Sequence, residues 1–407
     1  MIPVPRRARK GVAVAVPVAT CLVIAACSSS SSNAPSSTSS SSSAAVPSIS
    51  IASLTNNFSA MSALKPLAAE GKGSVAVILP DTVTSARYTE FDAPYLSEAL
   101  SQAGLTTSQF SVQNAQGSDA TELTDAQEAI TKGASVLVMD PLDSTIGAQI
   151  EAYAKSHGVA VVDYDRLTLG GSRQYYVSFN NVKVGQLIGN GMVSCASDWH
   201  VSKPNVLVMK GAPTDNNATL FAQGYLGVLS PLFSGSGWVN VGEPAGTWDP
   251  PTAETEFQQQ FTAHKNMNAV LVPNDENAAP IITYLQRLHV KPDTFPVTGQ
   301  DATLVGLQNI LTGYQCGTVY KPIYGEAQAA AALAMYLRAG KTPPSELVNG
   351  STPDSQTNTS VPSVLLTPEW VTASNMSSTV IADQFVPAQQ LCAGSFAVAC
   401  KSAGISA

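Results

Sequence analysis

Short apolar runs alternate along the chain with longer segments whose apolar residues recur every three or four positions. The first run, SVAVIL at 74–79, has the composition of a strand buried on both faces, and 90–103 has the spacing of an amphipathic helix. We expect further strands at 110–113, 135–139, from 159, 206–209, 239–242, 269–272, 296–298 and 318–320. We expect further helices at 121–132, 144–157, 182–193, 220–229, 253–264, 278–288, 302–311 and 325–339. Alternation of this kind predicts parallel sheets with helices on both faces.

The alternation restarts at about residue 182, which divides it into two units of similar size. More than 300 residues follow residue 71, and that is more than one hydrophobic core usually supports. The pattern therefore predicts two similar α/β lobes with a cleft between them.

The first 70 residues have a different composition. Residues 1–27 combine a basic start with an apolar run too short for a comfortable membrane span, and they end in IAAC at Cys27. This segment resembles the signal peptide of a bacterial lipoprotein, in which the cysteine is lipidated and becomes the mature N-terminus. The serine-rich sequence that follows has few large apolar residues, so we expect a disordered tether over 28–70.

Composition and charge exclude some classes of protein. The formal net charge is −8, the pI is about 5.0, and the basic cluster lies in the signal segment. A nucleic-acid-binding surface needs a basic patch, so nucleic acid is not expected as a partner. Charged residues make up 12% of the chain, about half the usual share, which leaves Ser, Thr, Asn and Gln to cover much of the surface.

Four cysteines remain outside the signal segment: Cys195, Cys316, Cys392 and Cys400. An even number in an exported protein favours disulfides, and four cysteines allow three connectivities. We prefer a small loop closed by Cys392 and Cys400, with Cys195 and Cys316 paired in the second lobe. The spacing suggests no zinc site.

Sequence signals for catalysis are weak. GxGxxG, Walker A, HExxH and GxSxG patterns do not occur, and the four histidines fall near predicted helix ends. Acid pairs such as Asp163 and Asp165 are suited to proton transfer only if their geometry allows it. We therefore expect no enzyme activity and no cofactor or metal.

Polar side chains follow the predicted strands of both units. Asp165 and Arg166 come directly after the buried run that starts at Val159, and similar clusters follow the strands before and after it. Ligands of open parallel sheets bind beyond the carboxyl ends of the strands. One such cluster is ordinary turn chemistry, but seven in the same topological place indicate a site. Carboxylates, amides, Arg, Lys and flat aromatic rings suit a small neutral molecule rich in hydroxyls.

Several motifs between about 74 and 385 are distinctive in order and spacing: YDR (164–166), FNNVKVG (179–185), PTDNNATLF (213–221), PND (273–275), GQDA (299–302), VYKP (319–322) and VPSVLLTP (361–368). With these motifs the chain resembles the xylose-binding branch of the type I periplasmic binding proteins, the solute receptors of sugar ABC transporters.

The resemblance implies a ligand set drawn from both lobes. It comprises Arg87, Tyr88, Asp165, Arg166, Asn217, Trp248, Asn274, Asp301 and Lys321. The chain departs from the family pattern at two places: Tyr88 stands where the family has a tryptophan, and the segment around Trp248 is about one residue shorter. The C-terminal tail from residue 386 has no counterpart in the pattern.

The resemblance also implies the organisation of the domains. We expect two Rossmann-like lobes joined by a three-crossing hinge, with crossings near 179–182, 321–322 and 361–363. The N-terminal lobe would comprise 71–181 and 322–361, the C-terminal lobe 182–321 and 362–385, and the tail 386–407.

The expected function is capture of a monosaccharide, xylose or a related aldose, by a monomeric lipoprotein on the outer face of the cytoplasmic membrane. The partner would be the permease of an ABC transporter. Two alternatives remain from the sequence: a receptor that serves a membrane signalling system, and an exported enzyme that acts on a sugar. A sugar-responsive repressor would need a basic DNA-binding headpiece, and the signal and tether stand in its place.

Overall fold

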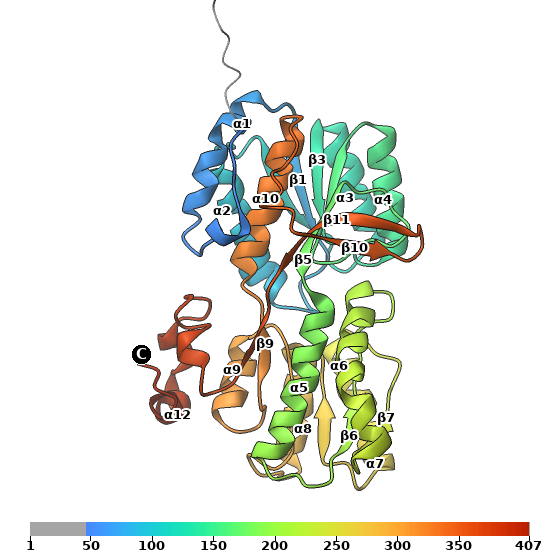
Figure 1. Cartoon of the computed structure of the whole chain (residues 1–407), viewed down its shortest axis with the longest axis vertical. Coiled ribbons are helices and arrows are strands. Elements are labelled where there is room, and N and C mark those ends of the chain that lie inside the picture. The colour runs from blue at the N-terminus through green and yellow to red at the C-terminus, as the bar shows by residue number, and fades with distance from the viewer. Residues whose placement is uncertain (1–45, 407) are drawn as a thin grey trace, which may run out of the picture. The chain divides into compact units, whose positions relative to one another are not determined.

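The computed structural model describes residues 46–406, which form two α/β lobes (Figure 1). The predicted signal segment, the lipidation site Cys27 and the tether up to residue 45 lie outside the described residues. No helix within 46–406 has the length and apolar character needed to cross a membrane.

The first lobe contains a seven-stranded sheet in the order β10-β11-β5-β4-β3-β1-β2. Its strands are β1 (Ser74–Leu79), β2 (Phe110–Asn114), β3 (Ala134–Met139), β4 (Ala160–Tyr164), β5 (Tyr175–Phe179), β10 (Gly350–Asp354) and β11 (Thr359–Leu366). Neighbouring strands are parallel except β10 and β11, which are antiparallel. The predicted class, a mostly parallel α/β sheet, is confirmed.

Helices cover both faces of this sheet. One face packs against α1 (Lys65–Glu70), α2 (Ala93–Gln102) and α10 (Ile323–Arg338), and the other against α3 (Asp119–Thr131) and α4 (Ser144–Ser156). Successive residues of β1 point to opposite faces of the sheet. Val75, Val77 and Leu79 pack on the face covered by α1, α2 and α10, and Ala76 and Ile78 pack on the face covered by α3 and α4. This double burial explains the continuous apolar runs in the sequence.

The second lobe repeats the arrangement on a smaller scale. Its central sheet has the order β7-β6-β8, formed by β6 (Asn205–Val208), β7 (Val239–Gly242) and β8 (Ala269–Leu271). Bridges at Val297 and Gln300 continue it towards β9 (Thr318–Tyr320), which pairs with β12 (Glu369–Val371). The helices are α5 (Asn181–Asp198), α6 (Asn216–Gly235), α7 (Pro250–Ala263), α8 (Asp275–Arg287) and α9 (Leu304–Leu311).

Three chain crossings join the lobes. The first lies between β5 and α5, and the second, between β9 and α10, contains Lys321, both where the sequence predicted them. The third was predicted near 361–363, and this position is wrong. Strand β11 continues to Leu366 because residues 363–366 pair with β5, so the chain crosses at Thr367 and Pro368.

Residues 46–70 are folded, so the prediction of a tether up to residue 70 is wrong over this part. The segment forms η1 (Ile51–Ser53), η2 (Ser59–Leu64) and α1, and Met61, Leu64 and Leu67 are fully buried in the core of the first lobe. These apolar side chains are spaced for a short helix, and their burial offsets the cost of ordering the segment.

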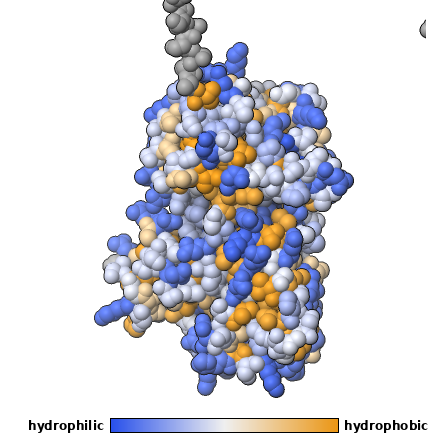
Figure 2. Space-filling model, viewed as in Figure 1, coloured by the Kyte–Doolittle hydropathy of each residue, from blue (hydrophilic) through white to orange (hydrophobic). Residues whose placement is uncertain are grey.

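The C-terminal residues pack mainly on the second lobe. They include η4 (Met376–Ser378), α11 (Ala388–Leu391), η5 (Gly394–Phe396) and α12 (Ala397–Ser402), and buried Leu391 shares an apolar cluster with Leu307 and Ile310 of α9. The structure contains both preferred disulfides, Cys195–Cys316 and Cys392–Cys400. Figure 2 shows polar and apolar residues interspersed over both lobes on one face.

Candidate ligand-binding site

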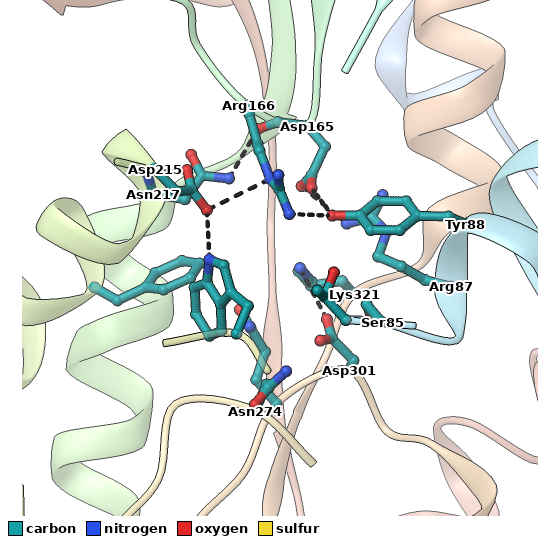
Figure 3. A pocket seen from close by; sticks show the side chains of 14 residues that line it. Ser85, Arg87, Tyr88, Asp165, Arg166, Asp215, Asn217, Asn274, Asp301 and Lys321 are labelled. Atoms are coloured by element: carbon teal, nitrogen blue, oxygen red, sulfur yellow. Dashed lines mark hydrogen bonds and ion pairs between the residues drawn. The ribbon is translucent and has the colours of Figure 1, made fainter. Parts of the chain in front are cut away.

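A cavity lies where the strand ends of the two lobes meet. It contains about 340 Å³ of space between protein atoms, including the part open to solvent. Its lining is Thr84, Ser85, Arg87, Tyr88, Asp165, Arg166, Asp215, Asn217, Phe221, Trp248, Asn274, Gln300, Asp301 and Lys321 (Figure 3). All nine residues of the predicted ligand set are among them.

The turn after β4 brings Asp165 and Arg166 into the cavity. Asp165 has a φ of 57°, a left-handed conformation that Asp tolerates better than most residues. Its carbonyl oxygen accepts hydrogen bonds from the Tyr176 hydroxyl (2.8 Å) and from Asn217 Nδ2 (3.0 Å) of the second lobe. The strained turn is thus fixed by contacts from both lobes, and the carboxylate is left facing the cavity.

Arg87 is held by carboxylates on several sides. Its Nε and Nη2 donate to Asp92 at 2.9 and 2.7 Å, Nη2 also donates to Glu326, and Nη1 donates to Asp165 at 2.9 Å. A guanidinium has five N–H donors, so these four bonds leave one for a ligand. Arg87 therefore acts mainly by orienting the Asp165 carboxylate.

Tyr88 lies between two guanidinium groups. Its hydroxyl accepts a hydrogen bond from Arg166 Nη2 at 2.9 Å and donates to Asp165 Oδ2 at 3.4 Å. The Arg87 and Arg166 guanidinium carbons lie 5.7 and 5.6 Å from the ring centroid, within cation–π range. These contacts fix the orientation of the Tyr88 ring and of its hydroxyl, so that the ring forms a flat wall of the cavity.

Asp215 and Asn217, at the start of α6, link the lobes on the opposite side. Asp215 accepts a 3.0 Å hydrogen bond from Trp248 Nε1 and lies 3.5 Å from Arg166 Nε of the first lobe. The Trp248 ring also lies against Gly211, where a Cβ atom would come within 2.1 Å of the indole. A hydrogen bond and a glycine therefore determine the position of this aromatic wall.

The polar end of the cavity is formed by Gln300, Asp301 and Lys321. Lys321 Nζ lies 2.9 Å from Asp301 Oδ1, but this oxygen accepts no well-aligned hydrogen bond, and neither does Gln300 Oε1. Asp301 has a φ of 90°, which is strained for a residue other than glycine. These two buried oxygens are suitable acceptors for ligand hydroxyl groups.

Burial and charge set the protonation of the site. Burial opposes ionisation of Asp165, but Arg87, Lys321 and Arg166 outweigh it and lower the pKa of this carboxyl. Burial likewise disfavours the charge on Lys321, yet Asp301 and the other carboxylates raise its pKa. Both groups are therefore charged at neutral pH and able to form charge-assisted hydrogen bonds.

The prediction omitted five of the lining residues: Thr84, Ser85, Asp215, Phe221 and Gln300. Asp215 and Gln300 belong to strand-end clusters that the sequence shows, so this signal was sufficient to find them. The others have no chemical pattern that separates them from ordinary loop and helix residues.

Two further carboxylates at strand ends have other roles. Asp275 accepts bonds from Thr303, Gln315 and Thr318 inside the second lobe, and burial raises its pKa to about 7. Asp163 accepts bonds from Thr168 in the first lobe. Both carboxylates stabilise loops and do not line the cavity.

The donors and acceptors of this site favour reversible binding of a small, neutral, hydroxylated molecule. Within residues 46–406, no cluster of three or more His, Cys, Asp or Glu side chains is arranged to hold a metal ion. Two lobes, a three-crossing hinge and an interlobe cavity together define the class of two-lobed solute-binding proteins.

Sequence comparison identifies the family. Residues 75–342 match the periplasmic binding protein domain, and the chain belongs to this family. It is 34% identical over 277 residues to the D-xylose-binding periplasmic protein of Escherichia coli (strain K12), an alignment that covers 67% of this chain and 80% of that protein. It is 31% identical over 347 residues to the multiple sugar-binding periplasmic receptor ChvE of Rhizobium radiobacter, covering 80% and 94%.

The fold has a counterpart among solved structures. A carbohydrate transporter solute-binding protein from Chloroflexus aurantiacus, solved in complex with D-glucose, superposes with a TM-score of 0.69 at 27% identity, covering 78% of this chain and 97% of that one. These relatives confirm the predicted family and fold, and they are binding proteins and not enzymes.

Proposed function

We propose that this protein is an extracytoplasmic solute-binding lipoprotein that captures a monosaccharide, xylose or a related aldose, and delivers it to an ABC-type sugar permease. The ligand would be enclosed between the lobes, and no covalent chemistry would take place. Arg87, Tyr88, Asp165, Arg166, Asn217, Trp248, Asn274, Asp301 and Lys321 would bind it.

One observation carries the proposal. Nine residues that the family resemblance implies as ligands, spread over more than 230 positions of the sequence, line a single cavity. The cavity offers an ionised carboxylate, cationic donors and two aromatic rings, and this is the combination that binds the hydroxyl groups and C–H faces of a sugar.

The names of the relatives support the ligand class. Those named for D-xylose or multiple sugars cover two thirds or more of the chain, and the neighbour at 27% identity was solved with D-glucose.

The first test is calorimetric titration of residues 46–407 with a panel of aldopentoses, hexoses and polyols. We expect Asp301→Ala to weaken binding of the cognate sugar about 30-fold, which corresponds to about 2 kcal/mol for a charge-assisted hydrogen bond. Asp119→Ala, an exposed carboxylate on α3, is the matched control and should bind as the wild type does. The proposal fails if no sugar binds, and the site assignment fails if Asp301→Ala binds normally.

The membrane anchor is a separate part of the proposal and has its own test. Cys27 follows the pattern of a lipidated cysteine, so the full-length protein should remain with membranes and incorporate a labelled fatty acid. Cys27→Ser should abolish the labelling and release the protein. Equal labelling of the two proteins would exclude Cys27 as the attachment site.

A further inference from the structure

The C-terminal segment of the second lobe also contacts the first lobe. Phe385 stacks on Phe91 of the first lobe with 4.0 Å between ring centroids and 15° between ring planes. Phe385 also packs against Tyr320 of β9 at 5.0 Å, and it is only 3% exposed. An aromatic contact between the lobes is therefore buried beside the hinge.

Asp383 adds polar contacts to both sides of the second chain crossing. Its Oδ2 accepts hydrogen bonds from the hydroxyls of Tyr320 (2.9 Å), before the crossing, and Tyr324 (3.1 Å), after it. Its carbonyl oxygen accepts a bond from Asn56 Nδ2 (2.9 Å) in the N-terminal segment of the first lobe. One residue thus connects β9, α10 and the N-terminal segment.

The stacking of Phe91 on Phe385 is connected to the cavity through η3 (Tyr88–Asp92), a single π-helical turn that contains Phe91. Tyr88 at its start lines the cavity, and Asp92 at its end holds the Arg87 guanidinium. Phe91 lies between them and stacks on Phe385. This five-residue turn therefore carries one side chain that lines the cavity, Tyr88, and also the contact with the C-terminal segment.

We propose that Asp383 and Phe385 are positioning residues for ligand binding. By holding η3 against the second lobe, they fix the Tyr88 wall and favour the closed arrangement of the lobes. This inference rests on the proposed function, because it concerns the affinity of the same cavity. It assigns part of that affinity to a segment that touches no ligand.

The physical reason is that the two rings belong to different lobes. Packing on α9 ties the C-terminal segment to the second lobe, whereas Phe91 belongs to the first. Opening the cleft would separate the rings and expose their apolar faces to water. The contact should therefore slow the release of a bound sugar.

The test measures sugar association and dissociation rates by stopped-flow fluorescence, using the cognate sugar and the Trp248 signal. We expect Phe385→Ala to raise the dissociation rate and the Kd about fivefold, or about 1 kcal/mol, with an association rate within twofold of the wild type. Phe385→Leu keeps an apolar side chain and protects the fold, and it should have a smaller effect in the same direction.

The control is Phe261→Ala, a partly buried phenylalanine that packs with Phe257 and Tyr284 within the second lobe. It should lower the unfolding temperature without sugar but leave both rates within twofold. If both Phe385 variants release sugar at the wild-type rate, the inference is wrong and the proposed function stands. If the wild type binds no sugar, both fail.

Discussion

At the scale of single residues, the cavity depends on side chains that position other side chains. Arg87 donates four hydrogen bonds to Asp92, Glu326 and Asp165. Burial disfavours the charge on Arg87, but these carboxylates outweigh burial and raise its pKa. A lysine at this position would keep the charge but lose the planar fork.

We therefore expect Arg87→Lys to weaken sugar binding at least tenfold and to destabilise the first lobe by about 3 kcal/mol, because buried carboxylates lose their partners. Thermal unfolding without sugar and calorimetric titration measure the two effects separately. Unchanged stability would show that Asp92 and Glu326 do not need this guanidinium.

Gly211→Ala should act on affinity with little effect on stability. A Cβ atom at this position would come within 2.1 Å of the Trp248 ring, so the indole must move and break its bond to Asp215. We expect about tenfold weaker binding in calorimetric titration, with an unfolding temperature close to that of the wild type. Gly227→Ala, where a Cβ meets no atom within 4 Å, is the matched control.

The nine expected ligand residues were predicted from the family resemblance, and five of them, Asp165, Arg166, Asn274, Asp301 and Lys321, also share the signal of a polar side chain just after a predicted strand. That signal also marks Asp163 and Asp275, which face inward and stabilise loops. Sequence position alone does not specify side-chain direction at a strand end. Thr84, Ser85 and Phe221 carry no such signal, and only the fold brings them to the cavity.

At the scale of elements, the central strands and helices were predicted because both faces of their sheets are buried. Strands β10, β11 and β12 were missed. β10 and β11 contain Pro353 and Pro362 and alternate in burial, as expected near the edge of a sheet, and β12 has three residues. Strand β5, also missed, begins with two tyrosines directly after a long loop.

The pair α5 and α6 supports the second lobe through close backbone contact. A Cβ atom at Gly224 would lie 2.3 Å from the Val182 carbonyl oxygen, and one at Gly185 would lie 2.1 Å from that of Phe221. We expect Gly224→Ala to push the helices apart and to lower the free energy of unfolding by about 2 kcal/mol in denaturant titration. A stability equal to that of the wild type would contradict this packing.

At the scale of the whole molecule, we expect closure of the lobes to be linked to protonation of Glu276. This residue of the second lobe accepts bonds from Ser85 Oγ (3.1 Å) and from the backbone N–H of Ala86 (2.9 Å) of the first lobe. Burial, followed by Asp301 and Asp275, raises its pKa from 4.5 to about 8. In an open form the carboxyl would face water and titrate near its ordinary value.

A carboxyl with a higher pKa in the closed form stabilises that form when protonated. The contribution is complete below about pH 4.5 and is lost as pH rises to about 8, so affinity should fall between about pH 4.5 and pH 8 and level off above that. Calorimetric titration at several pH values measures this fall, and Glu276→Gln should flatten it. A slope that survives in Glu276→Gln would assign the linkage to other groups, such as Asp215.

The order of strands in the first sheet has a consequence for biosynthesis. Strand β11 lies between β5 and β10, and α10 covers one face of the sheet, yet both come after the whole β6–β9 region of the second lobe in the sequence. A chain made from its N-terminus cannot complete its first lobe until about residue 366 has emerged. The apolar face that α10 will cover stays open to solvent or to a chaperone until residue 338 has emerged. The lobe that begins first is thus finished late, and a nascent chain stopped before α10 would expose the core on which its fold depends.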